Sequence, residues 1–280
     1  LPLNPPLMGP MILRGRSQDN ARGSKTSLFL DRKYRVSMAS PRDMDNEVGE
    51  AISAFKSGRP VMIYDSDYRE METDLLWHAA AATPEVIRRL RNDCGGLLFL
   101  AIGNEIGEMF GLPWLQDIHS HKSLVEENPV LGHLVTNDLQ YDSRSAFTLS
   151  LNHRETYTGI TDRDRSLTTR RFGELSGELI EKEEHWAKAR EILGKEFRTP
   201  GHIPVCRESP GGLKTRQGHT ELAVSIARLA GLTACTIGAE MLEPEGDGAL
   251  SLEGARAYAN KYGIPMITGE QISTIFNEKD

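Results

Sequence analysis

A short acidic stretch, residues 65–74 (DSDYREMETD), carries the side chains best suited to metal chemistry. It directly follows the apolar residues 61–64, which are typical of a buried strand, and α/β sites usually lie where strands end. Side chains alternate along an extended chain, so Glu70, Glu72 and Asp74 are expected to share one face. Such carboxylates repel one another unless a cation lies among them, and Mg²⁺ prefers oxygen ligands. A merely solvated acidic turn is the alternative, and the acidic stretch taken alone favours it.

A second stretch, residues 211–220 (GGLKTRQGHT), combines glycines, positive charge and the start of a predicted helix. Its glycines let the backbone approach a ligand closely, while Lys214 and Arg216 attract anions. The helix N-terminus, with Thr220 as the expected N-cap, adds unpaired N–H groups. His219 offers a neutral ring nitrogen to a metal. The stretch therefore predicts an anion site, and a flexible surface loop is the alternative.

Three further features are candidates for catalysis. Glu240 ends an apolar strand, where burial would raise its pKa. His202 lies in a turn before another strand, a position at which a lone histidine is usually structural. The hydroxyl groups of segment 158–165 could hold phosphate or sugar oxygens, or Thr161 and Asp164 could form a capping box that opens a helix.

Interleaved strand and helix patterns position these residues. Apolar runs and alternation predict strands at 61–64, 97–102, 146–151, 203–206, 235–239 and 264–267. Helical periodicity, caps and terminal glycines predict helices at 47–56, 83–92, 161–195, 221–229 and 252–262. Loops and short helices are expected over 104–142. The interleaving predicts an α/β (α+β) fold, with mixed sheet(s) and flanking helices in a single compact catalytic domain over 43–280.

Residues 1–42 differ in composition from the rest of the chain. They are rich in proline and arginine, poor in acidic residues, and show no periodicity that would bury a face. We therefore predict a basic, disordered tail. An Arg- and Ser-rich transit peptide is the alternative.

Composition limits the class of partner and the compartment. The formal net charge of the 280 residues is -7, and an acidic field repels phosphates, so neither nucleic acid nor an anionic membrane is an expected partner. No apolar run approaches the roughly 18 residues that span a bilayer. The three cysteines are scattered and form no C-x-x-C pair, which favours a reduced, cytoplasmic location over a disulfide framework.

The order and spacing of the motifs resemble the 3,4-dihydroxy-2-butanone 4-phosphate synthase family of riboflavin biosynthesis, over roughly residues 47–277. The matching blocks are 65–74, Phe147-Thr148, Thr158-Gly159-Ile160-Thr161, Pro200-Gly201-His202, 215–221 and Glu240. The segments 152–154 and 194–198 are similar to the archaeal branch. One departure is Met71, where the family usually has asparagine or glycine; this change removes no acidic residue.

The resemblance implies a lyase that converts ribulose 5-phosphate to L-3,4-dihydroxy-2-butanone 4-phosphate and formate. It also implies Mg²⁺ or Mn²⁺ as cofactor and a homodimer with sites at the subunit interface. Carried over onto this sequence, Glu70 and His219 are metal ligands, and His202 and Glu240 are catalytic. The implied substrate-binding residues are Arg69, Glu70, Asp74, Arg216, Gln217, Gly218, His219, Thr220 and Glu240.

Two alternatives stay open at this level. One is another metal-dependent sugar-phosphate aldolase or isomerase, for which the same groups would serve. The other is a non-catalytic domain that binds an anion or a nucleotide. A fused GTP cyclohydrolase II activity is not expected, because the scattered cysteines supply no zinc site.

Overall fold

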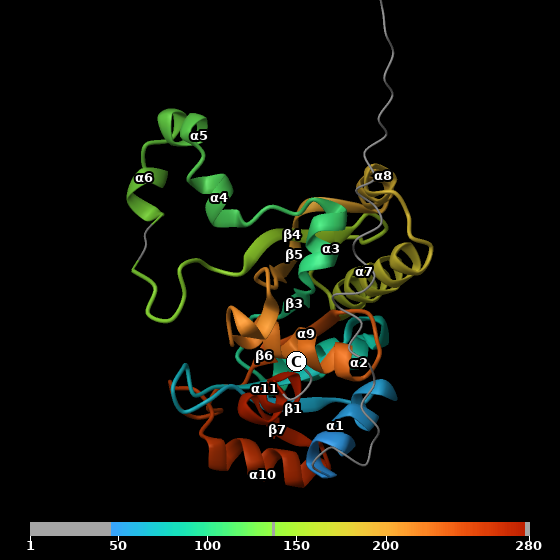
Figure 1. Cartoon of the computed structure of the whole chain (residues 1–280), viewed down its shortest axis with the longest axis vertical. Helices are drawn as coiled ribbons and strands as arrows, with labels where there is room; N and C mark the ends of the chain where they lie inside the picture. The colour runs from blue at the N-terminus through green and yellow to red at the C-terminus, as the bar shows by residue number, and fades with distance from the viewer. Residues whose placement is uncertain (1–45, 136–137, 278–280) are drawn as a thin grey trace, which may run out of the picture.

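The centre of the fold is a mixed β-sheet (Figure 1). The computed structural model describes residues 46–135 and 138–277, and the strands among them follow the order β4-β5-β3-β6-β2-β1-β7. The strands are β1 (Val61–Tyr64), β2 (Thr73–His78), β3 (Phe99–Ile102), β4 (Phe147–His153), β5 (Phe197–Arg207), β6 (Cys235–Glu240) and β7 (Met266–Thr268). Pairs β1–β7 and β3–β5 are parallel, and the other pairs are antiparallel. The predicted fold class is confirmed, whereas the predicted tail 1–42 lies outside the described residues.

Helices cover both faces of this sheet. The longer ones are α1 (Asn46–Lys56), α2 (Pro84–Asp93), α7 (Asp162–Glu181), α8 (Trp186–Glu196), α9 (His219–Leu229), α10 (Leu252–Tyr262) and α11 (Gly269–Asn277). The shorter ones are α3 (Asn104–Phe110), α4 (Leu115–His119), α5 (Lys122–Glu127) and α6 (Leu131–Leu134). The prediction of one helical stretch over 161–195 is wrong, because Glu183 between α7 and α8 has a φ of 49°. A left-handed residue cannot continue a right-handed helix.

Strand β2, which the sequence patterns did not predict, carries one wall of the site. All six of its residues are buried, and it pairs with β1 on one side and β6 on the other. Its side chains alternate between the faces: Asp74 contacts His219 of α9, whereas Trp77 lies under the guanidinium of Arg89 in α2. Helices on both faces remove the polar–apolar alternation that marks a half-exposed strand.

Side-chain caps set where several helices begin. Helix α2 has the predicted N-cap, Thr83. The hydroxyl of Thr161 accepts the N–H of Asp164 at 3.1 Å, so Thr161 caps the start of α7 as predicted. The carboxylate of Asp164 accepts the N–H groups of Thr158 and Gly159, so the described residues form the cap without the reciprocal bond of a capping box. The prediction of Thr220 as the N-cap of α9 is wrong. The N-cap is Gly218, and Thr220 is buried in the first turn.

The segment from α4 to α6 stands away from the sheet as an arm (Figure 1). Short helices were predicted here and are present. Within the described residues, α4, α5 and α6 have no buried side chain. The chain then returns to β4 through residues 138–146, and this return segment lines the cavity of the site.

Candidate active site

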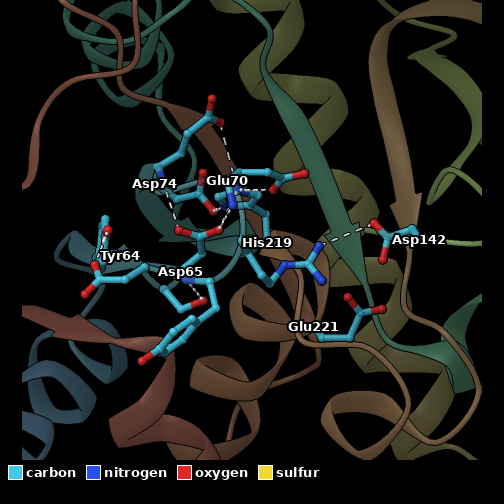
Figure 2. Close-up of polar contacts among 12 residues, drawn as sticks. Tyr64, Asp65, Glu70, Asp74, Asp142, His219 and Glu221 are labelled. Carbon is cyan, nitrogen blue, oxygen red and sulfur yellow. Dashed lines mark hydrogen bonds and ion pairs between the residues drawn. The ribbon is translucent and has the colours of Figure 1, made fainter. Parts of the chain in front are cut away.

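Carboxylates of the acidic stretch surround the ring of His219, the first residue of α9 (Figure 2). Nδ1 of His219 lies 2.7 Å from Oδ2 of Asp74, and Nε2 lies 2.8 Å from Oε2 of Glu70. Carboxylate oxygens of Asp65 and Glu72 each lie 4.0 Å from the same Nε2. We call these five residues the carboxylate end of the site.

The turn between β1 and β2 brings these carboxylates together. The buried carboxylate of Asp65 accepts the N–H groups of Glu70 and Glu72, both at 2.9 Å. Between them Met71 has a φ of 57°, a left-handed conformation that costs roughly 1 kcal/mol for a residue with a side chain. The assumption of an extended chain fails at Met71, and the chain is extended in β2 only from Thr73 onward. The prediction that Glu70, Glu72 and Asp74 share one side is confirmed, because all three lie around the His219 ring. The carboxylates converge because the turn folds back onto Asp65.

The charges at the carboxylate end depend on one another. Burial disfavours protonation of the His219 ring, but Asp74 and Glu70 outweigh it and raise the pKa of His219 well above its ordinary value. Contact with this ring in turn lowers the pKa of Glu70. Burial raises the pKa of Glu72. Glu240 of β6 is the direct cross-strand partner of Asp74 in β2. Burial and the charge of Asp74 raise the pKa of Glu240 to about 7. Glu240 therefore exchanges a proton near neutral pH.

The residues at the carboxylate end fit a divalent cation. Within the described part of the chain, Oε2 of Glu70 and Nε2 of His219 are buried and have no hydrogen-bond partner, although they lie 2.8 Å apart. Two ligands about 2.1 Å from one Mg²⁺ and at right angles lie about 3.0 Å from each other. The ligand atoms of Asp65, Glu70 and His219 all lie within 4.8 Å of one another. Because Asp65 already accepts two N–H groups, Glu70 and His219 are the better-suited ligands.

Two arginines form a second charged group beside the carboxylates. Nη2 of Arg216 lies 2.7 Å from Oδ2 of Asp142, and Nη2 of Arg69 lies 3.3 Å from the same oxygen. Nη1 of Arg216 also binds the fully buried carboxylate of Glu221 at 2.5 Å. Figure 2 shows Asp142 on the side of Glu221, apart from the carboxylate end. We call Arg69, Arg216 and Asp142 the guanidinium end of the site.

Gly218 lets the backbone pass close to the Arg216 side chain. A Cβ at Gly218 would lie 2.4 Å from Nη1 of Arg216. This guanidinium is held by Asp142 and Glu221, so it could not move aside without breaking an ion pair. A side chain at Gly218 would therefore disturb the guanidinium end.

One cavity of about 440 Å³ joins the two ends. The predicted site residues that line it are Glu70, Arg216, His219, Thr220 and Glu240. Its other lining residues include Glu72, Leu97, Phe99, Leu139, Gln140, Tyr141, Asp142, Phe147 and Cys206. Side chains suited to metal ligation, proton transfer and anion binding thus share one space that is open to a small ligand.

Gln217 and His202 lie apart from this cavity. Gln217 is exposed, and neither residue is among those lining the cavity in the described chain. His202 is exposed in β5, where its N–H donates to Oδ1 of Asn152 at 2.9 Å. Strand β3 lies between β5 and the strand that carries Glu240. A single chain therefore does not bring His202 and Glu240 together, and the catalytic role of His202 stays a prediction.

Comparison with known proteins agrees with this arrangement. Residues 49–275 match the family model described as 3,4-dihydroxy-2-butanone 4-phosphate synthase. The chain belongs to this family. The family member of that name from Methanothermobacter thermautotrophicus is 38% identical over 231 residues, which cover 82% of this chain and 96% of the relative. Its counterpart from Archaeoglobus fulgidus is 40% identical over 224 residues, covering 80% and 91%. The predicted likeness to the archaeal branch is confirmed.

A solved structure extends the comparison to metal binding. It is a 3,4-dihydroxy-2-butanone 4-phosphate synthase in complex with two magnesium ions, and it is 25% identical to this chain. The TM-score is 0.62, and the match covers 82% of this chain and 96% of that one. A protein similar to this chain therefore binds magnesium.

Two residues of the site, Asp65 and Asp142, are not individually predicted by the sequence patterns. Asp65 belongs to the acidic stretch, and its position directly after a buried strand is the signal that marks it. Asp142 is an isolated aspartate in a loop, which has no distinguishing spacing.

Among the described residues, no helix is both long enough and apolar enough to cross a bilayer.

Proposed function

We propose that the protein converts ribulose 5-phosphate to L-3,4-dihydroxy-2-butanone 4-phosphate and formate, a step of riboflavin biosynthesis. One observation carries the proposal: Glu70 and His219, from distant stretches, meet in a cavity that Arg216 also lines. A metal-binding pair beside a fixed guanidinium suits a substrate with both a ketone and a phosphate group.

The proposed metal ligands are Glu70 and His219. A bound Mg²⁺ or Mn²⁺ would supply Lewis-acid polarisation of the ketone and the neighbouring hydroxyl group. The contact of Asp74 with Nδ1 of His219 orients the ring so that Nε2 faces Glu70. Asp65 holds the backbone of the turn in place.

The proposed phosphate site is the guanidinium end together with the start of α9. Arg216 and Arg69 supply positive charge, and Thr220 lines the cavity together with Arg216. The first N–H groups of a helix also favour an anion, and Gly218 keeps that approach free of a side chain. Gln217 remains in the proposed substrate-binding set through its place in the motif.

Glu240 is the proposed principal acid–base group. The reaction needs a proton removed next to a ketone, a hydroxyl lost as water, a shift of the carbon skeleton and hydrolytic loss of formate. A carboxyl group with a pKa of about 7 exchanges protons effectively at neutral pH. Glu72 lines the same cavity and is proposed to assist.

We further propose that the protein is a homodimer and that His202 serves the cavity of the partner subunit. His202 is exposed and lies apart from the cavity of its own chain. Mixing tests this arrangement: Glu70→Ala chains and His202→Ala chains, each inactive alone, should regain up to about a quarter of wild-type turnover when refolded together. That share follows because random pairing of equal amounts makes about half of the dimers mixed, and each mixed two-fold dimer has one intact site. No recovery from mixed dimers would contradict a shared site.

A formate assay tests the reaction itself. Purified protein with ribulose 5-phosphate and Mg²⁺ should release formate, and EDTA should stop the release. An aldolase or isomerase would consume the substrate without releasing formate. A non-catalytic binding domain would consume none, and Glu70→Ala would leave its ligand affinity unchanged in EDTA.

The proposed location is the cytoplasm. The three cysteines, Cys94, Cys206 and Cys235, are free thiols, and a reduced compartment keeps such thiols unpaired. Fractionation of the source cells, with immunodetection of the protein, would test this location.

A further inference from the structure

Asp142 lies at the point where a substrate phosphate is proposed to bind. Its Oδ2 alone contacts both arginines, at 2.7 Å from Arg216 and 3.3 Å from Arg69. The side chains of all three residues are about 14–15% exposed, so these ion pairs are only partly screened by water. We propose that Asp142 is a specificity-determining residue that occupies the phosphate-binding arginines and yields them only to a more highly charged anion. This inference rests on the proposed function for the role of the arginines.

The two arginines retain donor capacity beyond Asp142. Nε of Arg69 and Nε of Arg216 are buried and have no hydrogen-bond partner among the described residues. Oδ2 of Asp142 accepts a hydrogen bond from one nitrogen, Nη2, of each of the two guanidinium groups. A phosphate group presents three terminal oxygens and can accept from several donors of both arginines at once. The arrangement therefore has room for a better acceptor than the one it holds.

Charge decides which ligands can replace Asp142. Burial opposes its ionisation, but Arg216 and Arg69 outweigh burial and lower the pKa of Asp142, so a full negative charge competes for the two arginines. A monoanion such as a sugar carboxylate gains no charge advantage over this internal carboxylate. A phosphate dianion carries twice the charge and wins the exchange. The expected result is a site that accepts sugar phosphates and rejects sugar acids.

The position of Asp142 in the fold allows such an exchange. It belongs to the return segment 138–146, which leads from the arm to β4, and the adjacent Tyr141 packs its ring 5.5 Å from the guanidinium carbon of Arg69. Glu221, the other partner of Arg216, is instead a fully buried residue of α9. When phosphate arrives, Glu221 keeps Arg216 oriented while Asp142 moves away.

Direct binding of inorganic phosphate tests the inference. Titration calorimetry at constant ionic strength, with Mg²⁺ present, would compare the wild-type protein with Asp142→Asn. We expect phosphate to bind the variant on the order of tenfold more tightly, because an internal competitor is gone. Acetate should bind measurably to the variant and not to the wild type. Asp142→Glu, which keeps the charge, should resemble the wild type.

Asp117→Asn is the matched control, because it removes one negative charge from the same part of the chain. Asp117 lies in α4 and pairs with Arg144 at 3.5 Å, outside the cavity lining of the described chain. Its phosphate affinity should stay at the wild-type value. Unchanged or weaker phosphate binding by Asp142→Asn overturns the inference, because Asp142 would then orient the arginines and not compete with the ligand.

A parallel formate assay separates this inference from the proposed function. Tighter phosphate binding by Asp142→Asn without formate release from the wild type would leave the inference standing and refute the reaction. Formate release with weaker phosphate binding by the variant would refute the inference alone. Absence of phosphate binding to both proteins would refute the inference together with the assigned phosphate site.

Discussion

The carboxylate end and the guanidinium end share one cavity but treat their charges differently. At the carboxylate end, carboxylate oxygens of four residues lie within 4.0 Å of the ring nitrogens of His219. These residues are Asp65, Glu70, Glu72 and Asp74. At the guanidinium end, Arg216 and Arg69 already pair with acids of the same chain. The carboxylate end has excess negative charge, whereas the two arginines of the guanidinium end are balanced by the carboxylates of Asp142 and Glu221.

Because their charge balance differs, the two ends should respond differently to a ligand. The carboxylate end is incomplete without a cation, because one protonated ring cannot neutralise so many carboxylates. The guanidinium end is complete without an anion, so a ligand must replace an existing partner. Changes at the carboxylate end should therefore abolish turnover, whereas changes at the guanidinium end should mainly alter affinity.

The largest effect is expected from removing a proposed metal ligand. Glu70→Ala and His219→Ala should each lower kcat/KM on the order of a thousandfold or more, because the polarising cation is lost. Both residues lie at the cavity and not in the apolar core, so the fold should persist. Circular dichroism would check the fold, and calorimetric titration with Mg²⁺ would check metal binding. Retained Mg²⁺ affinity in both variants would contradict the assignment.

Arg216→Ala should have the next largest effect, mostly as a raised KM for the substrate. It should also destabilise the protein by about 3–5 kcal/mol, because the fully buried Glu221 loses its charged partner. The double variant Arg216→Ala with Glu221→Gln separates the two effects. Chemical denaturation should show recovered stability, while steady-state kinetics should show that KM remains high. An unchanged KM in the single variant would remove Arg216 from the phosphate site.

Glu240→Gln should show a pH-dependent gain in stability together with a loss of turnover. The pKa of Glu240 is raised from 4.5 to about 7, so the folded state prefers the protonated carboxyl. Stability is therefore lost as pH rises through this interval, and the amide avoids the loss. We expect the variant to be more stable than the wild type by about 1–3 kcal/mol at pH 8 and by nearly nothing at pH 4. Thermal unfolding at both pH values measures this, and an equal gain at both would refute it.

The smallest effect concerns strain in the turn of the carboxylate end. Met71→Gly should stabilise the protein by about 0.5–1 kcal/mol, because glycine adopts a φ of 57° without steric strain. Glu183→Gly is the matched control, since Glu183 has a φ of 49° between α7 and α8. Both variants should gain stability in urea denaturation, and only Met71→Gly should change Mg²⁺ affinity. Destabilisation by Met71→Gly would show that its side chain outweighs the strain.

Local patterns were sufficient for much of the fold and part of the site. Capping residues such as Thr83 and apolar runs such as 61–64 act over a few neighbours, so they are visible in the sequence. Strand β2 escaped prediction because its burial depends on helices packed on both faces. The convergence of Glu70 with His219 was predicted from the resemblance of the motifs and is present in the structure. The turn that presents Glu70 depends on hydrogen bonds to Asp65, which no local pattern indicates.

Residue types and their spacing are enough to identify the chemical groups of the site: a clustered set of carboxylates, a glycine-rich basic stretch and a histidine before an apolar helix. Which of these groups contact one another depends on how the whole chain folds. Asp74 meets a ring 145 positions further along the chain, and Asp142 meets Arg216 across 74 positions. Such contacts arise from sheet register and helix packing, which bring together residues that no local pattern relates.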